Sequence, residues 1–225
     1  MNTADISARD PASRSSRSRP RAQDPDGVRR DILAVATAEF AEKGFSGARV
    51  DEIAARTRTS KRMIYYYFGD KDGLFTAVLE AAYARIRTIE ATLDLASLSP
   101  VEAMRKIAEF TFAYQNNNPD FVRLVIIENI HGGEHLARSK TIQSLNLSIV
   151  HALRDIYNRG VASGDFRPGI DVIDIHMTIS ALSIFNVSNR ATFSLIFKRN
   201  MGSKAALAHR RKVVGETVLG FLRRG

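Results

Sequence analysis

Cationic and hydroxyl side chains are concentrated between Arg49 and Lys71, and their chemistry suits contact with DNA. Arginine and lysine donate hydrogen bonds to O6 and N7 of guanine, which is the commonest specific contact in the major groove. Serine and tyrosine hydroxyls donate to phosphate oxygens and so fix a protein on the duplex. The candidate DNA-binding residues are Arg49, Arg58, Ser60, Lys61, Arg62, Tyr65, Tyr66, Tyr67 and Lys71.

Two short helices must position these side chains. Small and apolar residues recur at helical spacing over 53–57, and residues 58–59 interrupt the pattern. Ser60 then opens a second helix, on which Ile64 and Phe68 fall on one face. Two helices joined by so short a turn are typical of a helix-turn-helix, whose second helix enters the major groove. The other face of that helix carries the cations and hydroxyls, so we expect it to contact DNA.

A further helix is expected from Lys71 to about Ile89. Its first turn combines the charge of a lysine with free backbone amides, which is a favourable place for a phosphate. The same helix leads out of the DNA-binding unit, so we expect it to link that unit mechanically to the rest of the chain.

The segment from Ile53 to Phe75 resembles the DNA-binding signature of TetR-type transcriptional repressors. The matching residues are Ile53, Ala54, Ser60, Tyr65, Tyr67, Phe68, Lys71 and Leu74, with Ile64 in place of a leucine. The resemblance implies an all-α protein in which an N-terminal three-helix DNA-binding unit precedes a helical ligand-binding and dimerisation domain. It also implies a ligand-responsive repressor that binds a palindromic double-stranded DNA operator as a homodimer, with an unknown small molecule as effector.

The three consecutive tyrosines cannot all point one way, because neighbours on a helix are about 100° apart. The resemblance assigns Tyr67 to a phosphate and Tyr65 to a phosphate or to packing. Tyr66 projects between them and is expected to touch the backbone or a thymine methyl group. For each tyrosine, packing alone is the alternative.

Two departures from the family pattern add positive charge. Where the family usually has Ala-Gly-Val before the second helix, this chain has Thr57, Arg58 and Thr59. An arginine at that turn costs about 1 kcal/mol if its φ is positive. Arg49 stands where the family often has a helix-capping threonine. Both arginines are expected beside phosphates, and the resemblance does not fix the geometry of the turn.

The composition favours a polyanionic partner. The chain has 225 residues, 44% of them hydrophobic, with a formal net charge of +9, which favours nucleic acid or an anionic membrane surface. No apolar run approaches the roughly 18 residues that span a bilayer, and the N-terminus lacks the apolar core of a signal peptide. We therefore expect a cytoplasmic protein with no membrane partner. The absence of cysteine excludes disulfides, thiolate zinc sites and cysteine nucleophiles, and no cofactor is expected.

Composition along the chain divides it into three parts. Residues 1–26 have almost no apolar side chains, which predicts a disordered basic tail. Residues 27–75 are expected to form the DNA-binding domain, with a first helix from Val28 to a left-handed cap near Gly44. Residues 76–225 are expected to form the ligand-binding and dimerisation domain.

The tail contains four arginines without an intervening acid, namely Arg14, Arg17, Arg19 and Arg21. They either form a basic arm that follows phosphates or enters a minor groove, or belong to a solvated tail without specific contacts.

The remainder reads as helices, and no segment alternates cleanly enough to predict a strand. Breaks rich in Gly, Pro, Asn and Ser separate them. The expected helices span 101–115, 120–130, 134–162, 171–197 with a bend near Asn189, and 204–222.

Polar groups inside these apolar helices are candidates for a small-molecule site, since such pockets are mostly apolar with a few orienting groups. The candidate ligand-binding residues are Phe110, Tyr114, Phe121, Asn129, His176, Phe185 and Asn189. Each polar member has the alternative of being a satisfied core or inter-helix residue. By resemblance, the last two helices form the dimer interface through Ile179, Leu182, Phe185, Val213, Val214, Val218, Leu219 and Phe221.

The alternative from another class is a metallopeptidase. His131-Gly-Gly-Glu134-His135 has the form H-x-x-E-H of an inverted zinc-peptidase signature. The signature needs a helix through all five residues, and two consecutive glycines cost about 2 kcal/mol within a helix. A polar loop between helices is the favoured interpretation, so neither catalysis nor a metal is expected.

Overall fold

The computed structural model describes residues 24–57 and 59–223, and this part of the chain contains helices and no strand. The helices are α1 (Pro25–Gly47), α2 (Val50–Thr57), α3 (Lys61–Phe68), α4 (Lys71–Glu90), α5 (Pro100–Asn117), α6 (Pro119–Ile130), α7 (Glu134–Arg138), α8 (Lys140–Ala162), α9 (Val172–Ser188), α10 (Arg190–Ile196) and α11 (Lys204–Leu222). The all-α prediction is confirmed. None of these helices is long and apolar enough to cross a membrane. Residues 1–23 of the predicted tail, which include Arg14, Arg17, Arg19 and Arg21, lie outside the described residues, as does Arg58. For residues 24–26 the prediction of a disordered tail is wrong, because Asp24 caps α1 and the helix begins at Pro25.

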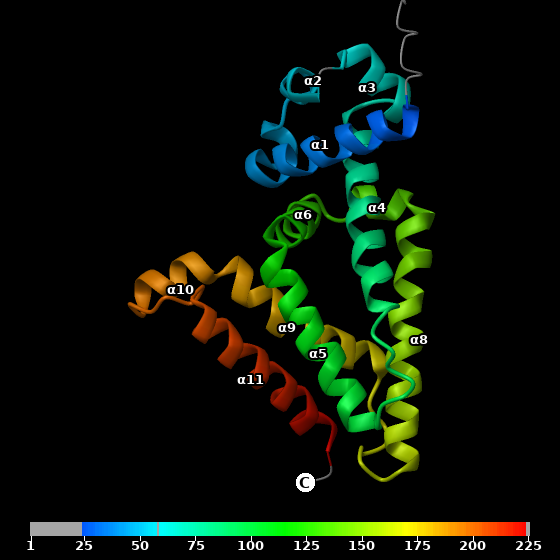
Figure 1. Ribbon diagram of the computed structural model, residues 1–225, viewed down its shortest axis with the longest axis vertical. Coiled ribbons are helices and arrows are strands. Elements are labelled where there is room, and N and C mark those ends of the chain that lie inside the picture. The colour runs from blue at the N-terminus through cyan, green and yellow to red at the C-terminus, as the bar shows by residue number, and fades with distance from the viewer. Residues whose placement is uncertain (1–23, 58, 224–225) are drawn as a thin grey trace, which may run out of the picture.

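Helices α1, α2 and α3 form a small unit at one end of the molecule (Figure 1). Ile32 and Phe40 of α1, Ile53 of α2 and Ile64 of α3 are fully buried in its core. Burial of one such side chain contributes about 1.5–3 kcal/mol, so α3 is held by its apolar face. Its opposite face is consequently left to solvent.

The first helix begins earlier than the apolar spacing predicted. The Asp24 side chain accepts a hydrogen bond from the Gly27 backbone N–H at 3.0 Å, so α1 starts at Pro25 instead of Val28. Proline fits the first turn of a helix because its missing N–H would have no partner there. Gly44 has the expected left-handed φ, 73°, and one further turn follows it to Gly47.

Helix α4 belongs to both parts of the structure. The Asp70 side chain accepts from the Gly73 backbone N–H at 2.7 Å, which fixes the start of the helix. Leu74 near its start is buried in the core of the α1–α3 unit, whereas Ile86 is buried in the bundle beyond. The helix runs from the unit alongside α8 (Figure 1), so it packs in both parts of the structure.

The remaining helices form a bundle around α5. Met104, Ile107 and Phe112 of α5 are almost fully buried, and α9 and α11 pack against the same helix. The start of α5 is fixed by a capping box, in which Ser99 and Glu102 exchange side-chain and backbone hydrogen bonds. Helix α5 therefore lies at the centre of the bundle, with α9 and α11 packed against it.

The segment predicted as one helix over 134–162 is two helices, and this part of the prediction is wrong. Ser139 has extended backbone angles, and its side chain accepts from the Ile142 N–H at 3.1 Å as the cap of α8. The Ser139 hydroxyl also donates to Glu80 of α4 at 2.7 Å, a contact that sequence spacing does not reveal. The predicted bend near Asn189 is confirmed, because α9 ends at Ser188 and α10 begins at Arg190.

Candidate nucleic-acid interface

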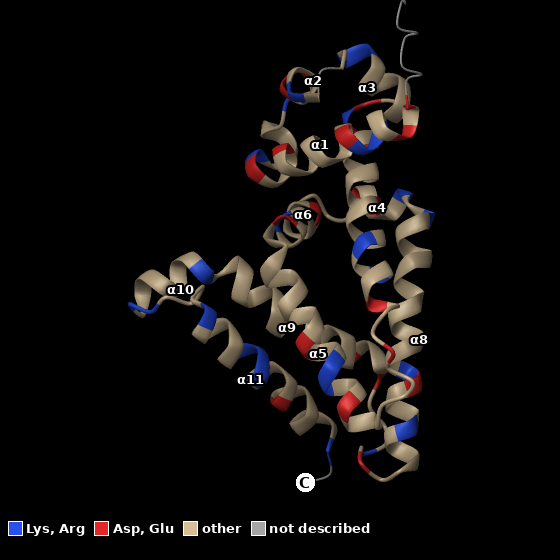
Figure 2. Cartoon of the chain, viewed as in Figure 1, with Lys and Arg blue, Asp and Glu red and all other residues tan. Residues whose placement is uncertain are grey.

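Helix α3 presents a basic face to solvent. Ile64 and Phe68 are buried, whereas Lys61, Arg62 and Tyr66 are exposed. The Ser60 side chain accepts from the Met63 backbone N–H at 3.2 Å and so starts the helix where the sequence predicts. Figure 2 shows the basic residues at this start, on the unit formed by α1 to α3. The helix has the apolar-inside, cationic-outside character that major-groove recognition requires.

Lys61 forms a weak ion pair with Asp51, which a group on DNA can replace. Its Nζ lies 3.1 Å from Asp51 of α2 and 5.9 Å from the centre of the Tyr65 ring. Both members of the ion pair are exposed, and such pairs contribute only about 0–1 kcal/mol. A phosphate or a base edge can therefore replace Asp51 at little cost.

The three tyrosines point in different directions, as the helical geometry predicts. Tyr66 is 78% exposed, and Tyr65 is about half as exposed. Tyr67 is half-buried and packs against the core of the unit, with its ring 6.2 Å from that of Phe68. Tyr66 is thus the tyrosine most open to an external partner.

Arg49 lies at the start of α2, next to a buried carboxylate. Glu39 accepts from the Arg49 backbone N–H at 3.3 Å and pairs with Lys43 at 2.9 Å and Arg56 at 3.4 Å. Burial raises the pKa of Glu39, but its bonds to Lys43 and Arg49 and the nearby positive charges outweigh burial and lower the pKa overall. Glu39 fixes the backbone at this point, while the Arg49 side chain stays exposed.

The ammonium group of Lys71 already makes contacts within the protein. Its Nζ donates to the Ser46 carbonyl at 3.3 Å and lies 5.0 Å from the centre of the Phe45 ring. Burial lowers its pKa. An ammonium group has three donors, so a phosphate can bind beside Ser46. Asp70 and Asp72 flank this position and oppose an anion there.

Arg29 is a candidate that the sequence did not single out. Its guanidinium lies 5.5 Å from the centre of the Phe68 ring, at the end of α3, and the side chain is exposed. Helical spacing indicates that Arg29 lies on the solvent face of α1. The sequence does not show that Arg29 lies close to α3, because that contact depends on packing between segments almost 40 residues apart.

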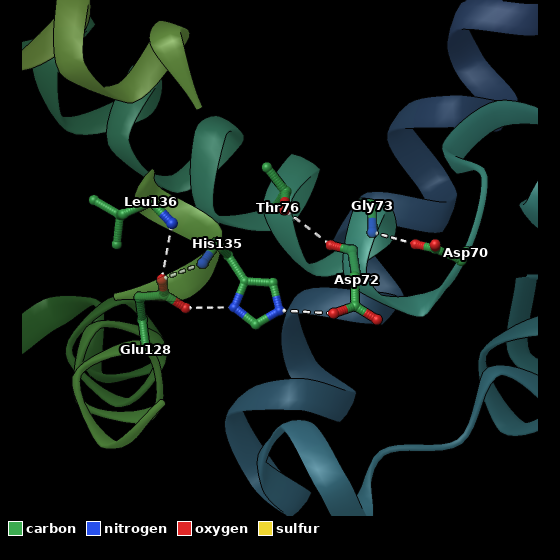
Figure 3. Close-up of polar contacts among 7 residues, drawn as sticks. All are labelled: Asp70, Asp72, Gly73, Thr76, Glu128, His135 and Leu136. Atoms are coloured by element: carbon green, nitrogen blue, oxygen red, sulfur yellow. Dashed lines mark hydrogen bonds and ion pairs between the residues drawn. The ribbon is translucent and has the colours of Figure 1, made fainter. Parts of the chain in front are cut away.

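A buried polar cluster joins the bundle to the first turn of α4 (Figure 3). Glu128 of α6 accepts from the backbone N–H groups of His135 and Leu136, both at 2.8 Å. His135 Nδ1 lies 2.7 Å from Glu128, and its Nε2 lies 3.4 Å from Asp72 of α4. The bundle therefore touches α4 one residue after Lys71.

This cluster also decides against the zinc-peptidase geometry. Gly132 and Gly133 have φ values of 69° and 79°, and α7 begins only at Glu134, so no single helix carries the five residues. His135 is buried toward Glu128, whereas Glu134 is exposed. Within residues 24–57 and 59–223, no group of three or more His, Cys, Asp or Glu could hold a metal ion. The metallopeptidase alternative is not supported.

The candidate ligand-binding residues do not all come together. Phe110, Tyr114 and Phe121 form one aromatic cluster, with ring centres 5.9 Å apart in each neighbouring pair. Phe121 and His176 line a cavity whose walls come from α4, α5, α6, α8 and α9. Phe185 and Asn189 line a separate pocket beside α10 and α11. Asn129 is exposed and donates to the Val125 carbonyl of its own helix.

Known proteins share both parts of this architecture. Residues 32–78 match the family "Bacterial regulatory proteins, tetR family", and residues 100–218 match "Tetracyclin repressor-like, C-terminal domain". The HTH-type transcriptional repressor NicS of Pseudomonas putida is 36% identical over 204 residues, which are 91% of this chain and 96% of NicS.

Solved structures show the same fold. A bacterial regulatory protein in the tetR family from Rhodococcus RHA1 has a TM-score of 0.69 at 20% identity and covers 88% of this chain and 98% of its own. FadR of Bacillus subtilis, solved in complex with stearoyl-CoA, has a TM-score of 0.64 at 17% identity, over 87% of this chain and all of FadR. The fold and the basic helix-turn-helix define a DNA-binding transcriptional regulator. The chain belongs to the TetR family of transcriptional repressors.

Proposed function

We propose that this protein is a ligand-responsive repressor that binds a palindromic operator as a homodimer. The observation that carries the proposal is the division of α3 into a buried face with Ile64 and Phe68 and an exposed face with Lys61, Arg62 and Tyr66. Side chains on such a face reach base edges when the helix lies in a major groove. Because the partner is DNA, we place the activity in the cytoplasm.

Within this proposal the contacts have two roles. Lys61 and Arg62 contact base edges, and Tyr66 contacts the backbone or a thymine methyl group. The residues proposed to bind the sugar–phosphate backbone are Arg29, Arg49, Arg58, Ser60, Tyr65, Tyr67 and Lys71. We assign DNA binding to residues 27–75 and ligand binding and dimerisation to residues 76–225.

An uncovered apolar row on α9 supports dimerisation. Ile173 and Met177 are 52% and 60% exposed, and Ala181 and Phe185 continue the row at four-residue spacing. Contiguous apolar surface of this kind marks an interaction site. Ile179, Val214, Val218 and Leu219 were also expected at the dimer interface, but they are buried in the core of their own chain, and we leave them out of the proposed surface.

The cavity beside α4 supports regulation by a ligand. It lies at the far end of the helix whose first residue is Lys71. A ligand that favours one position of α4 shifts the separation of the two α3 helices in a dimer, whereas palindromic half-sites require a separation of about 34–36 Å or a multiple of it. FadR, which has the same fold, holds stearoyl-CoA.

Selection of bound DNA from a random pool tests the proposal. The purified protein should enrich an inverted repeat, and unlabelled random DNA should compete poorly with the enriched sequence. Equal competition by random DNA would show an architectural basic protein without an operator and would overturn the proposal.

Sedimentation tests the dimer separately. Met177→Glu should convert dimer to monomer, because it places a charge within the apolar row. The matched control is Leu147→Glu on α8, which is also exposed, at 55%, and should leave the dimer intact. A dimer that persists in Met177→Glu would place the interface elsewhere.

A further inference from the structure

The cavity between α4, α5, α6, α8 and α9 has room for a one-ring compound. Its volume is about 160 Å³, and apolar side chains such as Ile86, Ile107 and Leu153 form much of its wall. A cavity of roughly 150 Å³ lined by similar residues binds benzene. The cavity is therefore compatible with a ligand whose body is small and apolar.

One guanidinium in the wall has an unused edge. Arg87 Nη1 donates to Glu90 at 2.5 Å, whereas the buried Arg87 Nε has no hydrogen-bond partner among the described residues. A buried donor without a partner costs about 1–3 kcal/mol. The planar fork of arginine matches a carboxylate in a bidentate geometry, so a carboxylate is the group that best satisfies this edge.

The other titratable groups in the wall allow an anion to enter. Burial raises the pKa of Glu90 to about 7, although Arg87 partly offsets this effect. Burial, and then the charge of Arg87, lower the pKa of His176, so its ring is neutral at neutral pH. Glu90 is the only carboxyl group among the described lining residues, and it can take up a proton when a second anion binds Arg87.

The side-chain oxygen of Gln115 is a second group in the cavity wall that could accept a hydrogen bond from a ligand. Gln115 is only 4% exposed, and its side-chain oxygen has no hydrogen-bond partner in the described part of the chain. This oxygen is an acceptor, so a hydroxyl or N–H on the ligand would satisfy it.

We propose that this cavity binds a small aromatic acid, with its carboxylate on Arg87 and a ring hydroxyl or N–H donating to Gln115. The inference rests on the proposed function, in that the ligand is taken to be the effector. Arg87 lies on the same helix as Lys71, and 16 residues of helix span about 24 Å. The carboxylate thus contacts the helix that leads to the DNA-binding unit.

Calorimetry on the full chain without DNA tests the ligand class. Benzoate, benzamide and benzylamine have similar size but are anionic, neutral and cationic. Benzoate should bind at least about tenfold more tightly than the other two. Tighter binding of benzamide or benzylamine, or no binding of any of the three, would overturn the proposal.

Two variants locate the carboxylate. Arg87→Lys keeps the charge but removes the planar fork, and should weaken benzoate at least about tenfold. Arg85→Lys is the matched control, since Arg85 is an exposed arginine on the same helix, and it should have no effect. Melting without ligand verifies that both variants fold. Unchanged benzoate affinity in a folded Arg87→Lys would refute the site.

Gln115→Leu tests the second contact. At least one of the three hydroxybenzoate isomers should bind the wild type more tightly than benzoate, and this advantage should disappear in the variant while benzoate affinity stays unchanged. An advantage that persists in Gln115→Leu, or is absent from all three isomers, would refute the role of Gln115. Operator binding by the ligand-free protein is measured separately. If the protein does not bind an operator, the proposed function is wrong. If it binds an operator but none of the acids, only this inference is wrong.

Discussion

Glu128 and His135 are joined twice, through the His135 backbone N–H at 2.8 Å and through its ring Nδ1 at 2.7 Å. Both residues are almost fully buried. The other ring nitrogen of His135 lies 3.4 Å from Asp72 of α4 but makes no hydrogen bond there, so the imidazole lies between a carboxylate of the bundle and the helix that follows α3. The buried pair therefore lies where the bundle packs against α4.

Glu128→Ala should destabilise the protein by about 3 kcal/mol or more, because it leaves the buried N–H groups of His135 and Leu136 without an acceptor. Urea unfolding measures the change in the free energy of unfolding. Glu216→Ala is the control, since Glu216 forms an exposed pair with Lys212 and should contribute less than about 1 kcal/mol. Equal effects of the two substitutions would show that the buried cluster adds no stability.

Arg62→Ala should relax sequence preference at one base pair of each half-site by about 1–3 kcal/mol. The reason is that Arg62 is exposed on α3 and is proposed to contact a base edge. Binding to a set of single-base variants of the selected operator measures the preference. Arg123→Ala on α6 removes an exposed arginine outside the proposed interface and should change nothing. A uniform loss across all operators would instead make Arg62 a phosphate contact.

Lys71→Ala should weaken all DNA sequences alike. With roughly 6 phosphate contacts per dimer, log affinity should fall against log salt with a slope of about −5 or steeper in the wild type. Removal of one phosphate contact reduces the slope by about 1 per site. Titrations at several salt concentrations measure both quantities. If the slope of log affinity against log salt is unchanged in Lys71→Ala, the Lys71 ammonium group binds the Ser46 carbonyl and not a phosphate.

Glu90 should make stability depend on pH. Because burial raises its pKa from 4.5 to about 7 in the folded protein, its contribution is fully present below about pH 4.5 and is lost as pH rises toward 7. The shift corresponds to an upper bound of roughly 3 to 4 kcal/mol. Glu90→Gln keeps an acceptor for Arg87 but does not titrate, so the stability of the wild type relative to the variant should fall between pH 5 and pH 8. Parallel unfolding profiles would contradict the raised pKa.

Local patterns predicted much of the DNA-binding unit. The start of α3 at Ser60 and the burial of Ile64 and Phe68 follow from capping and helical spacing, which involve neighbours within one or two turns. The bend at Asn189 was predictable for the same reason.

Features that depend on distant contacts could not be predicted. The break at Ser139 is stabilised in part by Glu80, and Arg29 reaches Phe68 only through packing. Arg87 and Gln115 likewise meet at one cavity because five helices converge there. The sequence predicts the helix that carries Arg87, but it does not distinguish Arg87 from the other charged residues of that helix.

The length of α4 has an evolutionary consequence. Lys71 and Arg87 lie toward opposite ends of one helix, so substitutions around the cavity leave the side chains that we propose to contact DNA untouched, and the reverse also holds. Under the proposed function, a lineage can therefore acquire a new chemical signal while it keeps its target genes, or acquire new targets while it keeps its signal. The two specificities are separately heritable traits within a single chain.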